Sequence, residues 1–283
     1  MNWIEEQLSK APFLRLDSEQ TTRLLVTTLR EEIEKVGFQR VVIGLSGGID
    51  SALSLYLAVR AFGADRVIAV RMPYRTSSTN SLTDAQIAVE ETGVESITID
   101  ITPQIDAYFN RFPEASPLRR GNKMARERMT ILYDLSAEHR ALVVGTSNRT
   151  EILLGYGTQF GDAASAVNPI GDLYKTQVRQ LASYLGVPQS ILDKPPSADL
   201  WSDQTDEGEL GFRYIDVDIL LYHLIDLGLS AQQVKQKGFD PSFVNHVVAR
   251  IRQNQFKRVM PIILKVGSRT VGTDFRYLRD WGV

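Results

Sequence analysis

The segment Val41–Ser51 reads VVIGLSGGIDS and carries the strongest structural signal in the chain. Its first half is a short apolar run rich in β-branched residues, which is typical of a strand buried on both faces. Residues 46–48 (Ser-Gly-Gly) then predict a tight turn, and Ser51–Phe62 has the apolar spacing of a helix that ends at Gly63. A strand that passes through a glycine turn directly into a helix begins a βαβ unit and predicts a parallel sheet.

The alternation of strands and helices continues on both sides of this segment. Ser18 is the expected cap of the first helix, and Gly37 is its expected end. The pattern predicts an α/β fold with a Rossmann-like, doubly wound parallel sheet that helices cover on both faces. In such sheets, ligands bind at the carboxyl ends of the strands. We expect further strands at residues 66–72, 96–101 and 141–144, and helices at residues 18–36, 84–92, 122–139 and 175–185.

The rest of the chain predicts one domain rather than two. No composition shift marks a linker, so we expect residues 1–283 to form a single unit. Its nucleotide-binding core is expected at about 20–200, and a helical C-terminal part at about 201–283, with a mostly helical pattern over 214–264. The polar segment 195–212 is a candidate active-site loop, the alternative being a solvated connector.

Composition excludes several classes of protein. Of 283 residues, 43% are hydrophobic and 23% are charged, which is typical of a globular chain. The net charge of −2 lacks the broad positive field of nucleic-acid binding, so we expect no nucleic-acid partner. The absence of cysteine excludes disulfides, thiolate metal sites and a catalytic thiol. No apolar run approaches the ~20 residues of a membrane span, and Glu5 and Glu6 stand where a signal peptide is basic, so we expect a cytoplasmic protein with no membrane partner.

The glycine turn is also the strongest candidate for a ligand site. Backbone N–H groups at a helix start attract anions, and Gly47 and Gly48 let a phosphate approach the main chain closely. A Walker A loop would need Lys at position 49 or 50, where this chain has Ile49 and Asp50. A carboxylate beside phosphates is compatible with a Mg²⁺ ion shared between them. The alternative is an ordinary turn in which Ser and Asp cap the helix.

Residues Ser46–Ser51 resemble the pyrophosphate loop of the N-type ATP pyrophosphatases, which cleave ATP between its α and β phosphates and adenylate a substrate oxygen. Four later segments, in the same order and spacing, are similar to those of the NAD synthetase family over roughly residues 20–280. They are GTSNRTE (145–151), NPIGDLYKTQ (168–177), KPPSADLW (194–201) and DQTDEGELGF (203–212). The resemblance implies the adenine nucleotide alpha hydrolase-like fold and a homodimer.

The resemblance also implies roles for individual residues. Asp50 and Glu151 would hold Mg²⁺ on the ATP phosphates, and Asp50 and Lys175 would be the catalytic pair. Deamido-NAD would be contacted by Arg126, Asn122 and Lys257. The ATP site would comprise Gly44, Leu45, Ser46, Gly47, Gly48, Ile49, Asp50, Ser51, Arg71, Met72, Thr146, Lys175 and Ser197. The ammonium of a lysine such as Lys175 is also suited to a phosphate that gains negative charge as pyrophosphate leaves.

Three positions depart from the compact ammonia-dependent enzymes. Gln159 and Ala166 stand where those enzymes often carry Lys and Asp, and Phe256 replaces the His of a His-Lys pair. These departures leave the deamido-NAD contacts open. In motif style the chain is closer to the synthetase domain of glutamine-dependent NAD synthetases, but it has no cysteine and no room before residue 40 for a glutaminase domain. We therefore expect ammonia that is either free or supplied by a separate subunit.

The activity that the resemblance implies is a two-step amidation. The carboxylate of deamido-NAD attacks the α-phosphorus of ATP, giving an acyl-adenylate and pyrophosphate, and ammonia then displaces AMP to form NAD⁺. Loops 73–83 and 197–212 would close to exclude water. Two alternatives remain: another adenylating enzyme of the superfamily, such as a GMP-synthetase-like or tRNA-modifying one, or a noncatalytic nucleotide-binding regulator. The presence of both Asp50 and Glu151 favours an enzyme.

Overall fold

A computed structural model of the chain describes residues 3–197, 205–259, 261–271 and 274. Its centre is a parallel sheet of four strands in the order β3-β2-β1-β4, which confirms the expected α/β fold. The strands are β1 (Arg40–Gly44), β2 (Val67–Arg71), β3 (Glu95–Thr98) and β4 (Ala141–Val144). Because β4 returns to pair with β1, the direction of winding reverses between these two strands. Such a reversal opens a crevice at their carboxyl ends.

Alternate residues of the central strands face two different helical layers. Val41 and Ile43 of β1 pack with α2 (Ser18–Glu34), α3 (Ile49–Phe62) and α8 (Lys175–Leu185) on one face of the sheet. Val42 points to the other face, where α5 (Thr102–Phe109) and α6 (Pro117–Glu138) cover the sheet. All three β1 side chains are fully buried. These three positions of the strand therefore need apolar residues, as the run in the sequence indicated.

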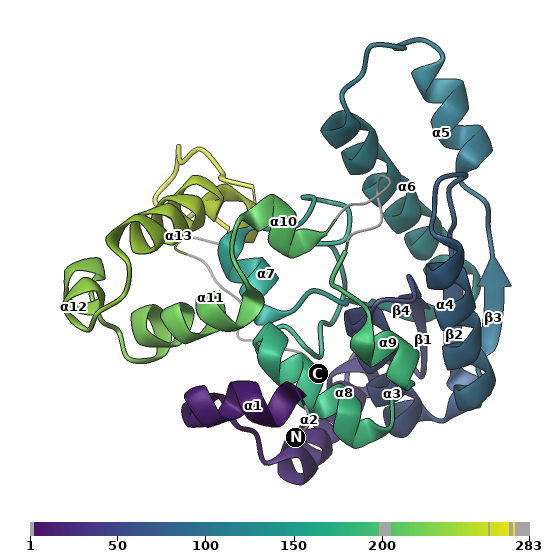
Figure 1. Cartoon of the computed structure of the whole chain (residues 1–283). Coiled ribbons are helices and arrows are strands. Elements are labelled where there is room, and N and C mark those ends of the chain that lie inside the picture. Colours follow the sequence, from purple (N-terminus) through teal and green to yellow (C-terminus); the bar gives the residue numbers. More distant parts are fainter. Residues whose placement is uncertain (1–2, 198–204, 260, 272–273, 275–283) are drawn as a thin grey trace.

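The boundaries of several elements differ from those expected. Asp17, not Ser18, caps α2, because its carboxylate accepts from the backbone N–H of Gln20 at 2.9 Å. Helix α4 spans Thr79–Thr92, so the loop after β2 is shorter than the expected 73–83. Strand β3 ends at Thr98, and the chain turns into α5, which the sequence pattern did not reveal. Figure 1 shows α5 and α6 projecting together beyond the sheet.

The C-terminal part forms a second cluster of helices with its own apolar core. Its core includes Leu8 and Leu14, so the N-terminal segment packs with the C-terminal helices such as α11 and α13. These elements are α1 (Trp3–Lys10), a 3₁₀ turn (Pro12–Leu14), α7 (Arg149–Leu154), α10 (Asp206–Leu210), α11 (Tyr214–Leu221), a π-helical turn (Tyr222–Asp226), α12 (Ala231–Gln236), α13 (Pro241–Gln253) and a 3₁₀ turn (Gln255–Arg258). A short helix α9 (Gln189–Asp193) follows α8 and packs on the sheet side. A further 3₁₀ turn, Ala64–Arg66, precedes β2.

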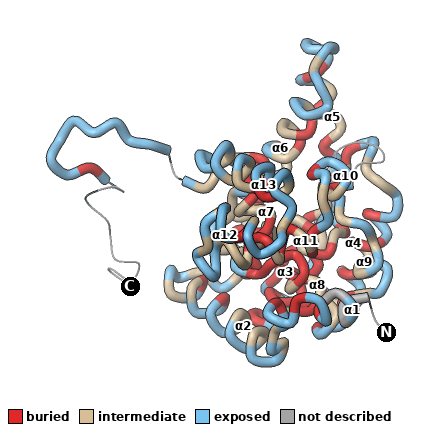
Figure 2. The backbone as a smooth tube through the Cα atoms, turned by 60° about the vertical axis from the view of Figure 1, so that its left-hand side comes forward, coloured by how far each residue is buried: buried red, intermediate tan, exposed pale blue. Residues whose placement is uncertain are grey.

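Two expectations for the C-terminal part need correction. The expected helical pattern to residue 264 ends at Arg258, and residues 261–271 are extended and mostly exposed (Figure 2). Their apolar side chains, such as Ile262 and Val266, have no buried face that would stabilise a helix. Within the polar segment 195–212, residues 206–210 form α10, while residues 198–204 lie outside the described part of the chain. Among the described residues, no helix combines the length and apolar character that a bilayer span requires.

Candidate active site

The glycine turn lies at the carboxyl end of β1, beside the crevice between β1 and β4. Gly47 has φ +77°, and a Cβ atom there would lie 2.1 Å from the carbonyl oxygen of Ser81 in α4. Ser46 Oγ accepts from the N–H of Gly48 at 3.2 Å, and Ser51 Oγ donates to the Gly48 carbonyl at 2.9 Å. The two serines thus brace the turn, which keeps backbone N–H groups at the start of α3 facing the crevice.

The alternative of an ordinary capped helix does not describe this turn. Gly48, and not a Ser or Asp residue, occupies the N-cap position of α3, so the N-cap residue supplies no side-chain cap bond. Of the residues expected in the ATP site, Leu45 and Ile49 are 3% and 5% exposed and belong to the apolar core. Gly44 faces Leu132 of α6. These three residues therefore offer backbone rather than side-chain atoms to a ligand.

Asp50, Glu151 and Lys175 come together at one point of the crevice. Asp50 lies in the first turn of α3, Glu151 in the first turn of α7 and Lys175 at the first residue of α8. The ammonium Nζ of Lys175 lies 2.5 Å from Asp50 Oδ2 and 3.2 Å from Glu151 Oε1. Lys175 is 2% exposed, so its charge is neutralised within the protein rather than by water. The three residues singled out in separate motifs thus form one cluster.

Asn148 links the two carboxylates and was not predicted from the sequence. It is fully buried and donates from Nδ2 to Asp50 Oδ1 at 2.9 Å. Its side-chain oxygen accepts from the backbone N–H of Glu151 at 3.0 Å, and this caps α7. The Ser-Asn sequence before Arg149 carries a visible N-cap signal. The bond to Asp50 spans 98 residues of sequence and has no local signal.

Burial and charge shift the pKa values of this cluster in defined directions. Burial raises the pKa of Glu151 above its ordinary range, although the Lys175 ammonium opposes the rise. Burial lowers the pKa of Lys175, but the carboxylates of Asp50 and Glu151 outweigh it and the net shift is upward. Asp206 is buried nearby, accepts from the hydroxyls of Tyr156 and Tyr214 at 3.1 Å each, and has a pKa raised by burial. The site is therefore rich in carboxylates around one fixed cation.

The donor set fits a magnesium ion that also binds phosphate. Two carboxylates approach a single cation position from different helices, as the Lys175 distances show. Mg²⁺ bound with a nucleotide usually takes one or two protein carboxylates and fills its other positions with phosphate and water oxygens. No group of three or more His, Cys, Asp and Glu side chains arranged for a metal ion occurs within the described residues. The protein alone therefore provides part of a coordination shell, as expected for an ion that arrives with its substrate.

A second cation, Lys194, fastens the glycine turn to α4. Its Nζ donates to Ser81 Oγ at 2.8 Å and lies 3.2 Å from Asp84 Oδ2 and 3.5 Å from the carbonyl of Gly47. Ser190 Oγ donates to the other oxygen of Asp84 at 2.9 Å. Lys194 begins the KPPSADLW segment, so the start of the candidate loop is anchored on the turn.

The other residues expected at the ATP site lie around the crevice. Arg71 is the last residue of β2 and donates from Nη1 to Gln86 Oε1 at 2.5 Å, while Met72 is 8% exposed and packs in the core. Thr146 lies in the loop directly after β4 and is half-buried. Ser197 is exposed and is the last described residue before position 198.

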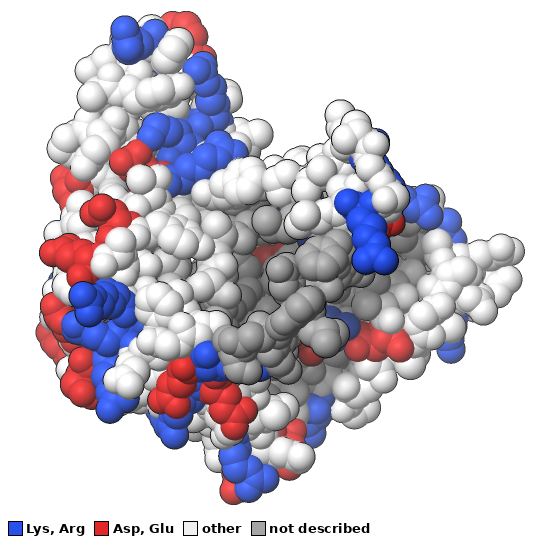
Figure 3. Space-filling view, turned by 180° about the vertical axis from the view of Figure 1, so that it is seen from behind, with Lys and Arg blue, Asp and Glu red and all other residues white. Residues whose placement is uncertain are grey.

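Two of the expected deamido-NAD residues, Arg126 and Asn122, lie in the first half of α6 and contact residues 158–159. Arg126 of α6 donates from Nε to the carbonyl of Gln159 at 3.1 Å, and Asn122 Oδ1 accepts from Thr158 Oγ1 at 2.7 Å. Figure 3 shows Lys and Arg side chains gathered on the projection of α5 and α6, beside a hollow in that face of the molecule. The loop that contains Gln159 is therefore held against α6.

Lys257 approaches the same loop from the opposite side. Its Nζ donates to the carbonyls of Gly155 and Gly157 at 2.8 and 2.9 Å, and burial lowers its pKa. The carbonyl of Phe256 accepts from Gln159 Nε2 at 3.5 Å. In the structure, Lys257 thus holds the backbone of the loop rather than presenting a free ammonium to the crevice.

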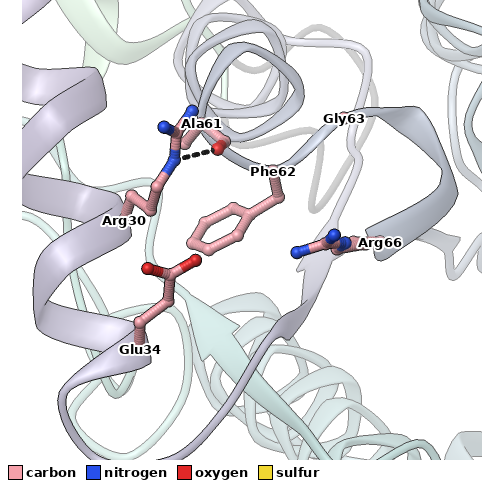
Figure 4. A pocket seen from close by; sticks show the side chains of 6 residues that line it. All are labelled: Arg30, Glu34, Ala61, Phe62, Gly63 and Arg66. Atoms are coloured by element: carbon pink, nitrogen blue, oxygen red, sulfur yellow. Dashed lines mark hydrogen bonds between the residues drawn. The ribbon is translucent and has the colours of Figure 1, made fainter.

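Two hollows among the described residues differ in how they relate to the site. One of about 430 Å³ lies between α8, α9 and α11 and is lined by Lys175 and Tyr214 among others, so it reaches the cluster of Asp50, Glu151 and Lys175. The other, about 330 Å³, lies at the far end of α3, where Arg30 donates to the carbonyl of Ala61 at 2.6 Å (Figure 4). That end is about 18 Å from Asp50 along the helix axis, at ~1.5 Å per residue from Asp50 to Phe62, the last residue of α3. None of the predicted site residues lines it.

Known proteins resemble this chain over most of its length. Residues 21–261 match the family model described as NAD synthase. The chain is 53% identical to an NH(3)-dependent NAD(+) synthetase of Trichlorobacter lovleyi, over 95% of this chain and 98% of the relative, and 54% identical to that of Chlorobium phaeovibrioides, over 96% and 98%.

Among solved structures, the fold is similar to NMN synthetase from Francisella tularensis, with a TM-score of 0.80, 32% identity and coverage of 89% of this chain and all of that one. It is also similar to the NH3-dependent NAD synthetase from Campylobacter jejuni, with a TM-score of 0.76, 35% identity and coverage of 88% and 100%. A glutamine-dependent NAD⁺ synthetase from Acinetobacter baumannii has a TM-score of 0.67 at 30% identity, and the match covers 94% of this chain but half of that one. The match over most of the chain, together with relatives above 50% identity, leads to one conclusion: the chain belongs to the NAD synthase family.

Proposed function

We propose that this protein is a ligase that amidates deamido-NAD to NAD⁺, with ATP as co-substrate and ammonia as the nitrogen donor. The observation that carries the proposal is the convergence of Asp50, Glu151 and Lys175 beside the glycine turn. Acyl adenylation needs a phosphate cradle, oxygen ligands for a divalent ion and a fixed cation at the leaving pyrophosphate. Membership of the NAD synthase family and the ammonia-dependent relatives support the choice of substrate.

In the first step, the nicotinate carboxylate attacks the α-phosphorus of ATP and pyrophosphate leaves. The turn at Ser46–Ser51 would hold the departing phosphates with its backbone N–H groups, and Lys175 would neutralise the charge that develops on them. In the second step, ammonia attacks the acyl carbon and AMP leaves with the carboxylate oxygen. The buried setting of Lys175 favours this chemistry, because electrostatic stabilisation is stronger where water is excluded.

We propose Mg²⁺ as the cation that Asp50 and Glu151 bind together with ATP. When bound, the ion supplies positive charge to the phosphate oxygens. Asn148 orients Asp50 for this role, since it fixes one carboxylate oxygen and leaves the other toward Lys175. The cytoplasmic location and the homodimer expected from the sequence remain predictions.

The first half of α6, with the loop at residues 158–159 that it contacts, is the proposed binding region for deamido-NAD. Arg126 is exposed there, and a guanidinium suits the two phosphates of a dinucleotide. Asn122 lies on the same helix, one turn away. Lys257 would act through the backbone of the loop at Gly155 and Gly157, which it holds in place.

The similarity to an NMN synthetase, at a TM-score of 0.80, suggests an alternative substrate, the mononucleotide counterpart of deamido-NAD. We would incubate the protein with ATP and Mg²⁺, and with either ammonium or glutamine. The acceptor would be deamido-NAD, its mononucleotide counterpart or xanthylate, and products would be separated by chromatography. We expect NAD⁺, AMP and pyrophosphate from deamido-NAD and ammonium. Amide formed mainly from the mononucleotide, or only from xanthylate, would replace the proposed substrate.

Substitution of Asp50 tests the proposed catalytic cluster. Asp50→Asn should lower the rate of AMP release by about 100-fold or more, because it removes an anionic ligand of the phosphate-bound cation. The matched control is Asp65→Asn, near the opposite end of α3, where the carboxylate is 81% exposed. If Asp50→Asn releases AMP as fast as the control variant, the catalytic assignment is contradicted and a noncatalytic regulator is favoured.

A further inference from the structure

Asp218 is a buried carboxylate that the proposed chemistry does not use directly. It lies on α11 and is completely buried. Its two oxygens accept three hydrogen bonds from two threonines: Thr150 Oγ1 at 2.6 Å, and Thr176 N and Oγ1 at 2.8 and 2.7 Å. A buried ionised group is costly unless donors surround it, so such a site is retained only where these bonds serve a purpose.

The two threonines stand next to the two residues that face the proposed ligand. Thr150 directly precedes Glu151 in the first turn of α7, and Thr176 directly follows Lys175 in the first turn of α8. Thr150 Oγ1 also accepts from the backbone N–H of Lys175 at 2.9 Å. A single carboxylate therefore holds the starts of both helices together.

These bonds replace partners that a helix start lacks. The first N–H groups of an α-helix have no acceptor within the helix. At the start of α8, the N–H of Lys175 is bound by Thr150 and that of Thr176 by Asp218. Lys175 and Glu151 are 24 residues apart, so their 3.2 Å contact depends on how α7 and α8 are placed relative to each other.

We propose that Asp218 is a positioning residue that sets the geometry of Lys175 against Glu151 through Thr150 and Thr176. The inference rests on the proposed function for its kinetic readout, since it assumes that Lys175 and Glu151 act on the phosphates. A shift of either group by about 1 Å is enough to cost on the order of 100-fold in rate. Asp218 does not touch the crevice, so its loss should affect the transition state more than the binding of ATP.

Three variants separate positioning from simple stability. Asp218→Asn keeps the shape but removes the negative charge and replaces one acceptor oxygen with an NH₂ donor, so at least one of the three threonine donors loses its acceptor. Thr150→Val removes the hydroxyl at nearly constant volume, and Thr150→Ser restores it. Gln180→Met is the matched control, because Gln180 is a buried residue of the same helix α8. Its side chain donates to the carbonyl of Leu14 and accepts from the N–H of Leu16 at 3.0 Å each, and it bonds at 3.3 Å to the carbonyl of Thr176, not to the N–H or hydroxyl that Asp218 binds.

The measurements are kcat, the KM for ATP, the melting temperature and amide hydrogen exchange of peptides covering residues 149–151 and 175–177. For Asp218→Asn we expect kcat to fall by on the order of 100-fold with KM changed by less than about threefold. For Thr150→Val we expect kcat to fall by on the order of 10-fold, and for Thr150→Ser we expect kcat to return most of the way to the value of the parent. Gln180→Met should melt earlier with kcat within about twofold of the parent.

The outcomes of this experiment are distinct. Two results would show that the positioning role is wrong when the parent protein makes NAD⁺. Either Asp218→Asn has the same kcat as the parent, or its kcat falls no further than that of Gln180→Met while the two variants have equal melting temperatures. If the parent makes no NAD⁺, the proposed function fails, and hydrogen exchange decides the inference alone. Faster exchange at both helix starts in Asp218→Asn, but not in Gln180→Met, then supports it, and unchanged exchange overturns it.

Discussion

At the scale of the residue, position 47 has two requirements that glycine meets and a residue with a Cβ atom does not. Its φ of +77° lies in the left-handed region, and the space beside its α-carbon is filled by the carbonyl of Ser81. The first requirement alone costs about 1–2 kcal/mol for a residue with a Cβ. The second requires the turn to move away from α4, which displaces the backbone N–H groups proposed to hold phosphate.

Gly47→Ala should therefore lose activity out of proportion to its loss of stability. We expect a fall of about 100-fold in kcat/KM for ATP, because the phosphate cradle shifts. The control is Gly93→Ala at the end of α4, where φ is +66° but no atom lies within 4 Å of the added Cβ. It should cost a similar strain energy and leave kcat/KM nearly unchanged. If a steady-state assay gives the two variants equal kcat/KM, the close approach of Ser81 to position 47 is not the reason why glycine is needed there.

Asp218 also predicts how stability depends on pH. Burial raises its pKa to about 6 from an ordinary value of 3.8, against the opposing hydrogen bonds of Thr150 and Thr176. The folded state therefore binds the proton more tightly than the unfolded state, and this residue's contribution to stability falls as pH rises from about 4 to about 6 and is constant above. The full change is on the order of 3 kcal/mol.

Comparison of the parent with Asp218→Asn isolates this contribution. Between pH 4 and pH 7, the parent should lose stability relative to the variant, since Asn does not titrate. The measurement is the free energy of unfolding in urea at several pH values for both proteins. A difference between them that stays constant across this range would show that Asp218 has an ordinary pKa.

At the scale of the element, Lys194, which directly follows α9, connects this segment to α4 and to the glycine turn. Through Asp84 and Ser81 it binds α4, and through the carbonyl of Gly47 it binds the glycine turn. Asp84 is 6% exposed, so loss of its cation leaves a buried carboxylate without its charge partner. Breaking such a pair from one side typically costs about 3–5 kcal/mol, whereas replacing both partners costs less.

Lys194→Met should lower the melting temperature and raise the KM for ATP by on the order of 10-fold, because the turn loses its anchor on α4. Adding Asp84→Asn should recover part of the stability but not the KM, since the buried charge is gone while the turn remains unanchored. Ser190→Ala removes one bond to Asp84 and keeps the ion pair, so it serves as the mild control. Full recovery of KM in the double variant would contradict an anchoring role.

At the scale of the whole molecule, the buried residues of the N-terminal segment, such as Leu8 and Leu14, pack with the C-terminal helices. Leu14 is completely buried in the cluster that contains Leu220 and Val244. Gln180 of α8 holds the same segment by accepting from the N–H of Leu16 and donating to the carbonyl of Leu14. Helix α8 also packs on the sheet core, so it joins the two clusters.

This arrangement predicts one cooperative unfolding transition for the chain. Leu14→Ala should lower the free energy of unfolding by about 2–5 kcal/mol and still give one transition by calorimetry. Leu24→Ala, at a position 63% exposed, should change it by less than about 0.5 kcal/mol. Two separate transitions in the Leu14 variant would mean that the C-terminal helices unfold as an independent domain.

The sequence alone determined the elements whose signals are local. The apolar run of β1, the turn at residues 46–48 and the end of α8 at Gly186 follow from side-chain burial and from glycine's access to positive φ, which act within a few residues. The motifs also identified Asp50, Glu151 and Lys175 as members of one site. Helix α5 was missed, because eight residues between a strand end and a loop carry a weak periodic signal.

Only the tertiary structure decided how these residues meet. Asp50 and Lys175 are 125 residues apart, and their contact depends on α3 and α8 starting at the same edge of the sheet. The roles of Asn148, Lys194 and Asp218 arise in the same way, since each is a polar side chain whose partners come from distant segments. A hydrogen bond depends on distances and angles that hold only after the chain is packed, and no spacing along the sequence encodes them.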